Sequence, residues 1–235
     1  MNLRININCI MISILIKAYL HNETQMYADE LPYFEDGSPF GHLEVKYEFI
    51  LTRLNLLNER IKEIHLCHET ILDKTKAHEY VSREESLRPL AFGLLFASDL
   101  KILTDELISL NYLLYQQHKT KIWPIEVKID CIGEFLKLKD KSGFDAFNNN
   151  IKTVETINHI GNAIKHSFVN SQVLWKRNLG AVPKLFAFYN HRNHLNNGVN
   201  FYEIEFPELI SNYNLILDDY RSEILKKYMK NWSLH

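Results

Sequence analysis

The segment from Ile151 to Phe168 concentrates the side chains best suited to chemistry. On a helix of about 100° per residue, Glu155, His159, Asn162 and His166 fall at i, i+4, i+7 and i+11, within roughly 60° of one another. Histidines that titrate near neutral pH can donate and accept protons, and a carboxylate and an amide can orient them. The spacing predicts one polar stripe whose candidate catalytic residues are His166, Asn162, His159 and Glu155.

Three interpretations of this polar stripe remain open from the residues alone. In the first, the stripe is a solvated face, and Glu155 and His159 form an ordinary helix pair. In the second, the two histidines do acid–base work. In the third, Glu155, His159 and His166 bind a metal, but imidazoles at i,i+7 lie about 10 Å apart along the axis, too far for one ion. We therefore predict no metal and no cofactor.

The opposite side of the same segment is apolar and must face the core. Five of its residues stack on one side of a helix, centred roughly 150° from the polar stripe: Val154, Ile157, Gly161, Ile164 and Phe168. The polar stripe then points away from the core and is buried only if another element or a second protomer covers it. Glycine in mid-helix costs about 1 kcal/mol relative to alanine, so Gly161 indicates the close approach of another helix.

The string G-N-A-I-K-H, from Gly161 to His166, resembles the motif of the HEPN superfamily, helical domains that often act as metal-independent RNases. That motif is an Arg, often followed by Asn, and then a His a few residues later. Asn162 and His166 match the Asn and the His, and Gly161 stands at the Arg position. The resemblance implies a multi-helix bundle with the motif on a late helix, and a homodimer that brings two motifs together.

The glycine at the Arg position matters for the chemistry. Cleavage of RNA through its 2′-hydroxyl needs a proton acceptor, a proton donor and a cation on the phosphate. His166 could serve as acceptor or donor, but Gly161 cannot supply the cation. Lys165 points about 100° away from His166, and Arg192 lies on a predicted hairpin tip; these two are the candidate phosphate contacts.

Two functions follow and stay open. The first, which the glycine favours, is a non-catalytic HEPN-like module of a defence or toxin–antitoxin system that dimerises or binds a protein or nucleotide partner through the stripe. The second is a metal-independent endoribonuclease, a toxin or phage-defence effector, that uses His166 on RNA.

The rest of the chain predicts a mainly all-α fold with a small β-hairpin near the C-terminus. Helical spacing of apolar residues predicts helices over 43–80, 90–115, 125–138, 144–170 and 208–230. Alternation predicts strands over Lys184–Tyr189 and Val199–Phe206, joined by a loop that ends in the turn signal Asn197-Gly198.

Local signals mark where the helices begin. Ser82 to Glu85 fits the S-x-x-E capping box at the start of the second helix. Three prolines suit the first helical position. We expect Pro89 to restart the second helix, Pro124 to open the third, and Pro207 to open the last.

A second group of metal-capable side chains lies in the first long helix: His65, Cys67, His68 and Glu69. It lacks the H-E-x-x-H spacing of helical zinc sites, so we interpret it as the edge of the core. The three cysteines, Cys9, Cys67 and Cys131, form no C-x-x-C pair, which favours a reducing compartment; we predict a cytoplasmic protein.

Composition limits the class of protein. The chain has 235 residues, 46% of them hydrophobic, and a formal charge of −2, which disfavours bulk electrostatic binding of nucleic acid. We expect residues 1–26 to be an N-terminal extension that is poorly packed or precedes the native start, and 27–235 to be one helical domain. The apolar run Cys9 to Ile16 is too short to span a bilayer, and we expect no membrane partner.

Overall fold

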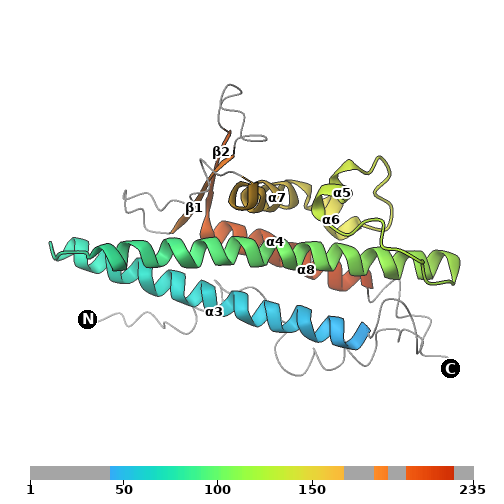
Figure 1. The fold of residues 1–235 in the computed structure, drawn as a ribbon, viewed down its shortest axis with the longest axis horizontal. Coiled ribbons are helices and arrows are strands. Elements are labelled where there is room, and N and C mark those ends of the chain that lie inside the picture. The colour runs from blue at the N-terminus through green and yellow to red at the C-terminus, as the bar shows by residue number, and fades with distance from the viewer. Residues whose placement is uncertain (1–42, 167–182, 190–199, 225–235) are drawn as a thin grey trace, which may run out of the picture. The chain divides into compact units, whose positions relative to one another are not determined.

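The structure, a computed structural model, describes residues 43–166, 183–189 and 200–224. Its elements in chain order are α3 (Leu43–Lys76), α4 (Arg83–Thr120), α5 (Ile132–Lys137), α6 (Asp145–Asn149), α7 (Ile151–His166), β1 (Lys184–Tyr189), β2 (Asn200–Glu205) and α8 (Phe206–Ile224) (Figure 1). The predicted fold class, mainly all-α with a small C-terminal β-hairpin, is confirmed. The predicted extension over 1–26 lies outside the described residues.

Contacts divide the chain into two units that share its long helices. The described part of the first unit lies within Leu56–Asp99 and His159–Tyr213. That of the second lies within Lys17–Asn55, Leu100–Asn158 and Asn214–His235. None of the described helices combines the length and the apolar composition needed to cross a bilayer.

In the first unit, the start of α4 is set by the predicted capping box. The Ser82 amide donates to Glu85 Oε2 (2.9 Å), and the Glu85 amide donates to Ser82 Oγ (3.2 Å), so two backbone donors at the helix start are satisfied reciprocally. The helix then continues through Pro89, so the expectation that Pro89 begins a helix is wrong. Pro89 is buried. Because proline has no backbone N–H, one helical hydrogen bond is missing at this position.

The core of the first unit gathers around the start of α8. Phe206 is fully buried and contacts the Phe96 ring edge-on, with ring centroids 4.8 Å apart. Its amide donates to the carbonyl of Pro183, just before β1. The last helix therefore begins at Phe206, one residue before Pro207, and residues beyond 224 lie outside the described part of the chain.

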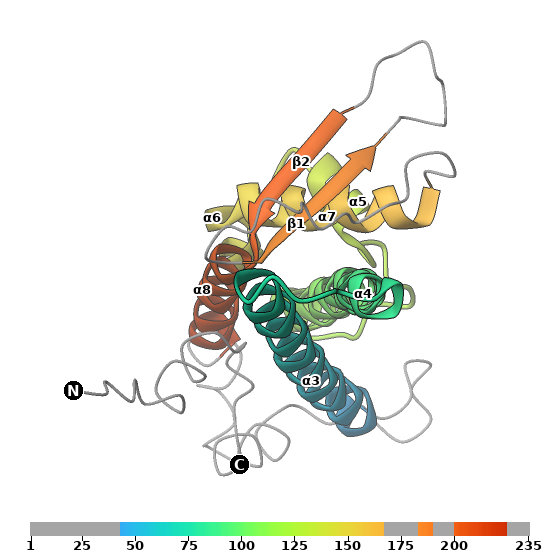
Figure 2. The same cartoon turned by 90° about the vertical axis from the view of Figure 1, so that its left-hand side faces the viewer.

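In the first unit, β1 has the predicted span, whereas β2 ends at Glu205, one residue before the predicted end, because Phe206 begins α8. Val199, the predicted first residue of the second strand, lies outside the described residues. β1 and β2 pair antiparallel, with Lys184 opposite Glu205 and Ala187 opposite Tyr202. The turn signal Asn197-Gly198 lies outside the described residues. The hairpin lies beside α7 (Figure 2).

In the second unit, an aromatic cluster packs around the short helices α5 and α6. Phe135 contacts Phe144 and Phe147, with ring centroids 5.6 and 5.9 Å apart, and Phe147 contacts Tyr220 of α8 at 5.7 Å. The α6 amide of Ala146 donates to the buried carboxylate of Glu223 (3.0 Å). These contacts connect two short helices that would not be stable alone.

The predicted helix over 125–138 is wrong over its first half. Only Ile132–Lys137 is helical, and Pro124 opens no helix. Ile125 is 92% exposed, so a helix there would bury no apolar face and would lack tertiary support. The amide of Ile132 donates to Asp105 Oδ1 of α4 (2.8 Å), and α5 begins at this residue rather than at Ile125.

The predicted helix over 144–170 is split in two. α6 ends at Asn149 and α7 begins at Ile151. Asn150, between them, donates its side-chain amide to the Ala146 carbonyl (2.8 Å) and to Asp219 of α8 (2.9 Å). An Asn side chain that bonds the backbone competes with helix continuation, so the break falls here.

Candidate functional site

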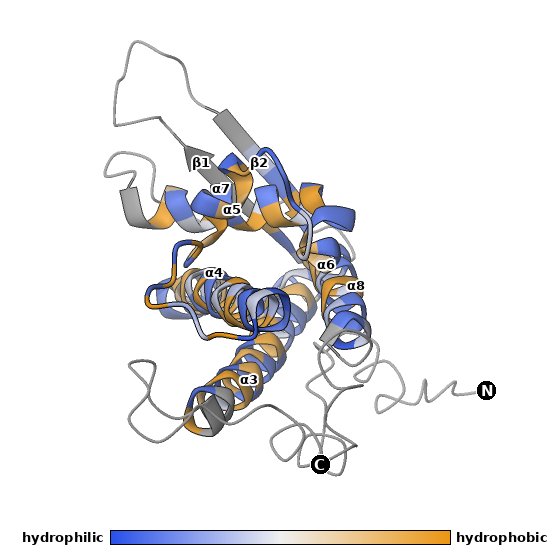
Figure 3. Ribbon diagram, turned by 90° about the vertical axis from the view of Figure 1, so that its right-hand side faces the viewer, coloured by the Kyte–Doolittle hydropathy of each residue, from blue (hydrophilic) through white to orange (hydrophobic). Residues whose placement is uncertain are grey.

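The residues of the predicted polar stripe lie on one continuous helix, α7. Glu155 is exposed, and His159 and Asn162 are half-buried. His166 is in the last turn of α7, but its side chain lies outside the described part, as do the side chain of Lys165 and the whole of Arg192. The helix alternates polar and apolar residues along its length (Figure 3).

The buried face of α7 is wider than the sequence predicted. Val154, Ile157 and Gly161 are buried, as expected, and Ile160 and Ala163 are also buried. Ile160 and Ala163 form a core cluster with Ala97 of α4. Ala163 lies only about 40° from His159 around the helix, which places the imidazole at the boundary of the buried face.

His159 stacks on Tyr202 of β2. The two ring centroids are 4.7 Å apart and the planes differ by 10°. Tyr202 and Ile204 alternate along β2 onto one side and pack against the Ala97 cluster. Glu203, on the other side of the strand, is exposed and pairs with Lys184 of β1 (2.8 Å). The chain's own hairpin therefore covers one edge of the polar stripe.

Gly161, at the motif's Arg position, is buried on the core side of α7. A guanidinium at this position would start from the buried side of α7, about 40° around the helix from Ile157, and would leave water, a costly placement without a charged partner. α7 continues unbroken through Gly161, so no turn requires the glycine here.

The second group of histidines belongs to the core of the first unit. The His65 ring packs on Phe206, with centroids 5.7 Å apart, and burial, together with the neighbouring His68, lowers the pKa of His65 from 6.5 to about 4. His65 Nε2 is buried and, among the described residues, has no hydrogen-bond partner. His65 is therefore a neutral aromatic packing group at neutral pH.

Cys67 lies beside this group and is also buried. Burial raises the pKa of its thiol, Arg88 opposes the shift, and Glu63 adds to it. The thiol is thus protonated and unreactive at neutral pH. Within the described residues, no three His, Cys, Asp or Glu side chains are grouped to hold a metal ion.

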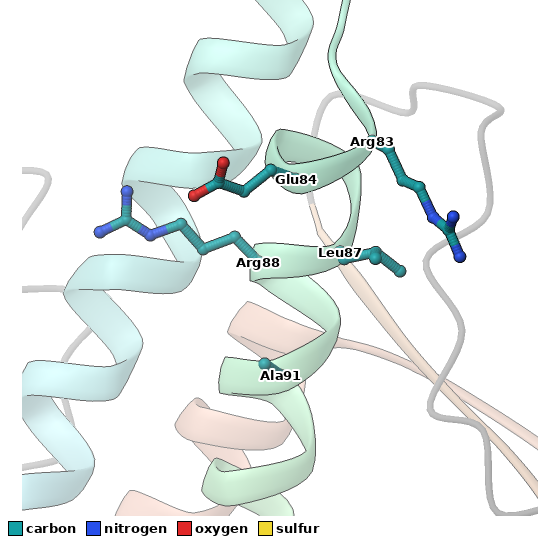
Figure 4. Close-up of a pocket in the computed structure, with 5 residues that line it drawn as sticks. All are labelled: Arg83, Glu84, Leu87, Arg88 and Ala91. Atoms are coloured by element: carbon teal, nitrogen blue, oxygen red, sulfur yellow. The ribbon is translucent and has the colours of Figure 1, made fainter.

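An open depression lies at the start of α4 (Figure 4). It has a volume of about 630 Å³, and the described residues that line it are Arg83, Glu84, Leu87, Arg88 and Ala91. Arg88 reaches toward α3, where its Nη2 is 3.7 Å from Glu63 Oε2, and Arg83 points to the other side (Figure 4). The sequence analysis did not predict this depression, although the spacing R-E-E-S-L-R puts Arg83 and Arg88 within two turns of one helix.

Comparisons of this chain with known protein families, curated proteins and solved structures found no match. The functional interpretation therefore depends on the geometry of α7 and on the motif that it carries.

Proposed function

We propose that this chain is a non-catalytic, HEPN-like helical module that forms a homodimer through the polar side of α7, as part of a defence or toxin–antitoxin system. The observation that carries the proposal is the buried Gly161 in place of the motif's Arg. Without a cation at that position, the helix keeps the surface of the motif but lacks the group that would stabilise charge on a phosphate.

The exposed part of the stripe suits a two-fold contact. Two α7 helices could cross antiparallel about a two-fold axis that lies midway between Glu155 and His159. Such an axis places the same residues of both copies in contact, so each Glu155 would face His159 of the second copy. Glu155 is exposed and available for such a contact, and the stack on Tyr202 holds the His159 ring in place. The contact would be lost when the carboxylate is replaced by a cation.

The test combines molecular mass with an RNA assay. Light scattering of the purified full chain is expected to show a dimer, and Glu155→Arg is expected to show a monomer. Glu69→Arg is the matched control, because Glu69 is an exposed carboxylate on α3. A monomeric wild type at high concentration contradicts the proposed dimer, and so does a dimeric Glu155→Arg.

One observation favours the second candidate, a metal-independent endoribonuclease. α7 stays helical as far as His166, so the backbone sets Asn162 and His166 one turn apart on the same side. This function requires a cation from elsewhere, and Arg192 is the candidate. Incubation with total RNA should then show cleavage that both His166→Ala and Arg192→Ala abolish; the non-catalytic proposal expects no cleavage by the wild type.

A further inference from the structure

Two isoleucines in the loop after α4 are strongly exposed. The loop covers residues 121–131 and contains no helix or strand. Ile122 is 72% exposed and Ile125 is 92% exposed, the highest value for a large apolar side chain in the described residues. Trp123 lies between them and is half-buried. The side chains of Ile122 and Ile125 lie mostly in water, which points to an external surface.

The backbone at both ends of this loop is held in place. At its start, Thr120 Oγ1 accepts from the Ile122 amide (3.2 Å), and Lys121 adopts the left-handed conformation with a φ of 60°. That conformation is uncommon for a residue with a side chain. At the far end, the Ile132 amide donates to Asp105 (2.8 Å). The two isoleucines are therefore presented by a defined turn.

The surroundings of the loop are basic, although the whole chain is not. Residues 117–143 contain six lysines and four carboxylates, a net charge of +2, in a chain whose formal charge is −2. The loop over 138–143 lies next to the end of α4, because the Tyr115 ring lies against Gly143 and Lys119 Nζ is 5.6 Å from the centroid of that ring. The segment contains no arginine.

We propose that this loop binds anionic lipid surfaces, with Ile122 and Ile125 inserted among the headgroups and the exposed Lys121 and Lys139 facing the lipid phosphates. Apolar anchors combined with basic residues are the features of proteins that bind at a membrane surface. The composition favours a lipid surface over a protein, because the centres of protein interfaces are enriched in arginine and depleted in lysine. The expectation of no membrane partner was based on spanning segments, and surface binding needs none.

The test is co-sedimentation of the full chain with vesicles of phosphatidylcholine alone or mixed with phosphatidylserine. The wild type is expected to bind the mixed vesicles and to be released as NaCl increases, since salt screens the lysines. Ile122→Ser with Ile125→Ser should weaken binding at least tenfold. Lys121→Asn with Lys139→Gln should also weaken it at least tenfold, since each lysine contributes roughly fivefold.

The matched control is Leu215→Ser, which removes another exposed aliphatic side chain, 53% exposed on α8, and should leave vesicle binding unchanged. Equal sedimentation with neutral and anionic vesicles would overturn the proposal, as would full binding by the double isoleucine variant. If that variant instead changes the oligomeric mass while the wild type ignores vesicles, the isoleucines belong to a protein contact and the lipid proposal is wrong.

Discussion

Restoring the motif's arginine at Gly161 is the sharpest test of the reasoning about α7. Gly161 is buried, and it lies only about 40° around α7 from the buried Ile157. The Gly161→Arg substitution would therefore place a guanidinium against apolar side chains. We expect the variant to be destabilised and to gain no RNase activity.

The magnitude of this effect follows from four contributions. Removing a charged group from water costs several kcal/mol, and overfilling a packed face costs about 1–3 kcal/mol. Replacing glycine in mid-helix returns up to about 1 kcal/mol, and the long Arg stem lets part of the charge reach water. The net loss of unfolding free energy should be about 4 kcal/mol, which lowers Tm by roughly 8–16 °C in a protein of this size.

Thermal unfolding followed by circular dichroism measures this loss, with two variants as controls. Gly161→Ala should change the unfolding free energy by no more than about 1 kcal/mol, because better helix propensity offsets one added methyl group. Glu69→Arg, at an exposed position on α3, should change it by less than about 0.5 kcal/mol. A Gly161→Arg variant as stable as the wild type would refute the claim that the side of α7 that carries Gly161 is buried.

Three further predictions concern stability. Gly143→Ala should cost about 2–4 kcal/mol in urea unfolding, because φ is +82° and the new methyl group would lie 2.7 Å from Cγ of Tyr115; a loss below 1 kcal/mol would contradict this. Ser82→Ala should cost about 1 kcal/mol by removing the acceptor of the Glu85 amide, whereas Ser82→Thr should retain most of the cap. The folded-state pKa of His65 is lowered, so the unfolded chain binds more protons than the folded chain between pH 6.5 and about 4. The free energy of unfolding should therefore decrease as the pH is lowered from 6.5 to about 4. His65→Phe should remove this part of the acid sensitivity, and an unchanged pH profile would count against it.

Helix starts and strand spans were predictable where local interactions decide them. The capping box of Ser82 and Glu85 needs only residues three apart in sequence, and it forms as expected. Alternation along Lys184–Tyr189 matches β1 residue for residue. Both signals depend on neighbours along the chain, and distant residues do not change them.

Local rules failed where a distant partner intervened. The helix expected over 125–138 is shortened because Ile132 bonds Asp105 of α4, and the helix expected over 144–170 is broken because Asn150 bonds Asp219 of α8. Pro89 stays inside α4, where it is buried although it removes one helical hydrogen bond. None of these contacts has a signature in the neighbouring sequence.

For the candidate site, sequence by itself determined that Glu155, His159 and Asn162 share one side of a helix and Gly161 the other, because helical geometry sets those angles for any chain. Only the tertiary structure decided what covers that helix. β2 brings Tyr202 onto His159, since a strand must bury its apolar side on whatever face lies next to it.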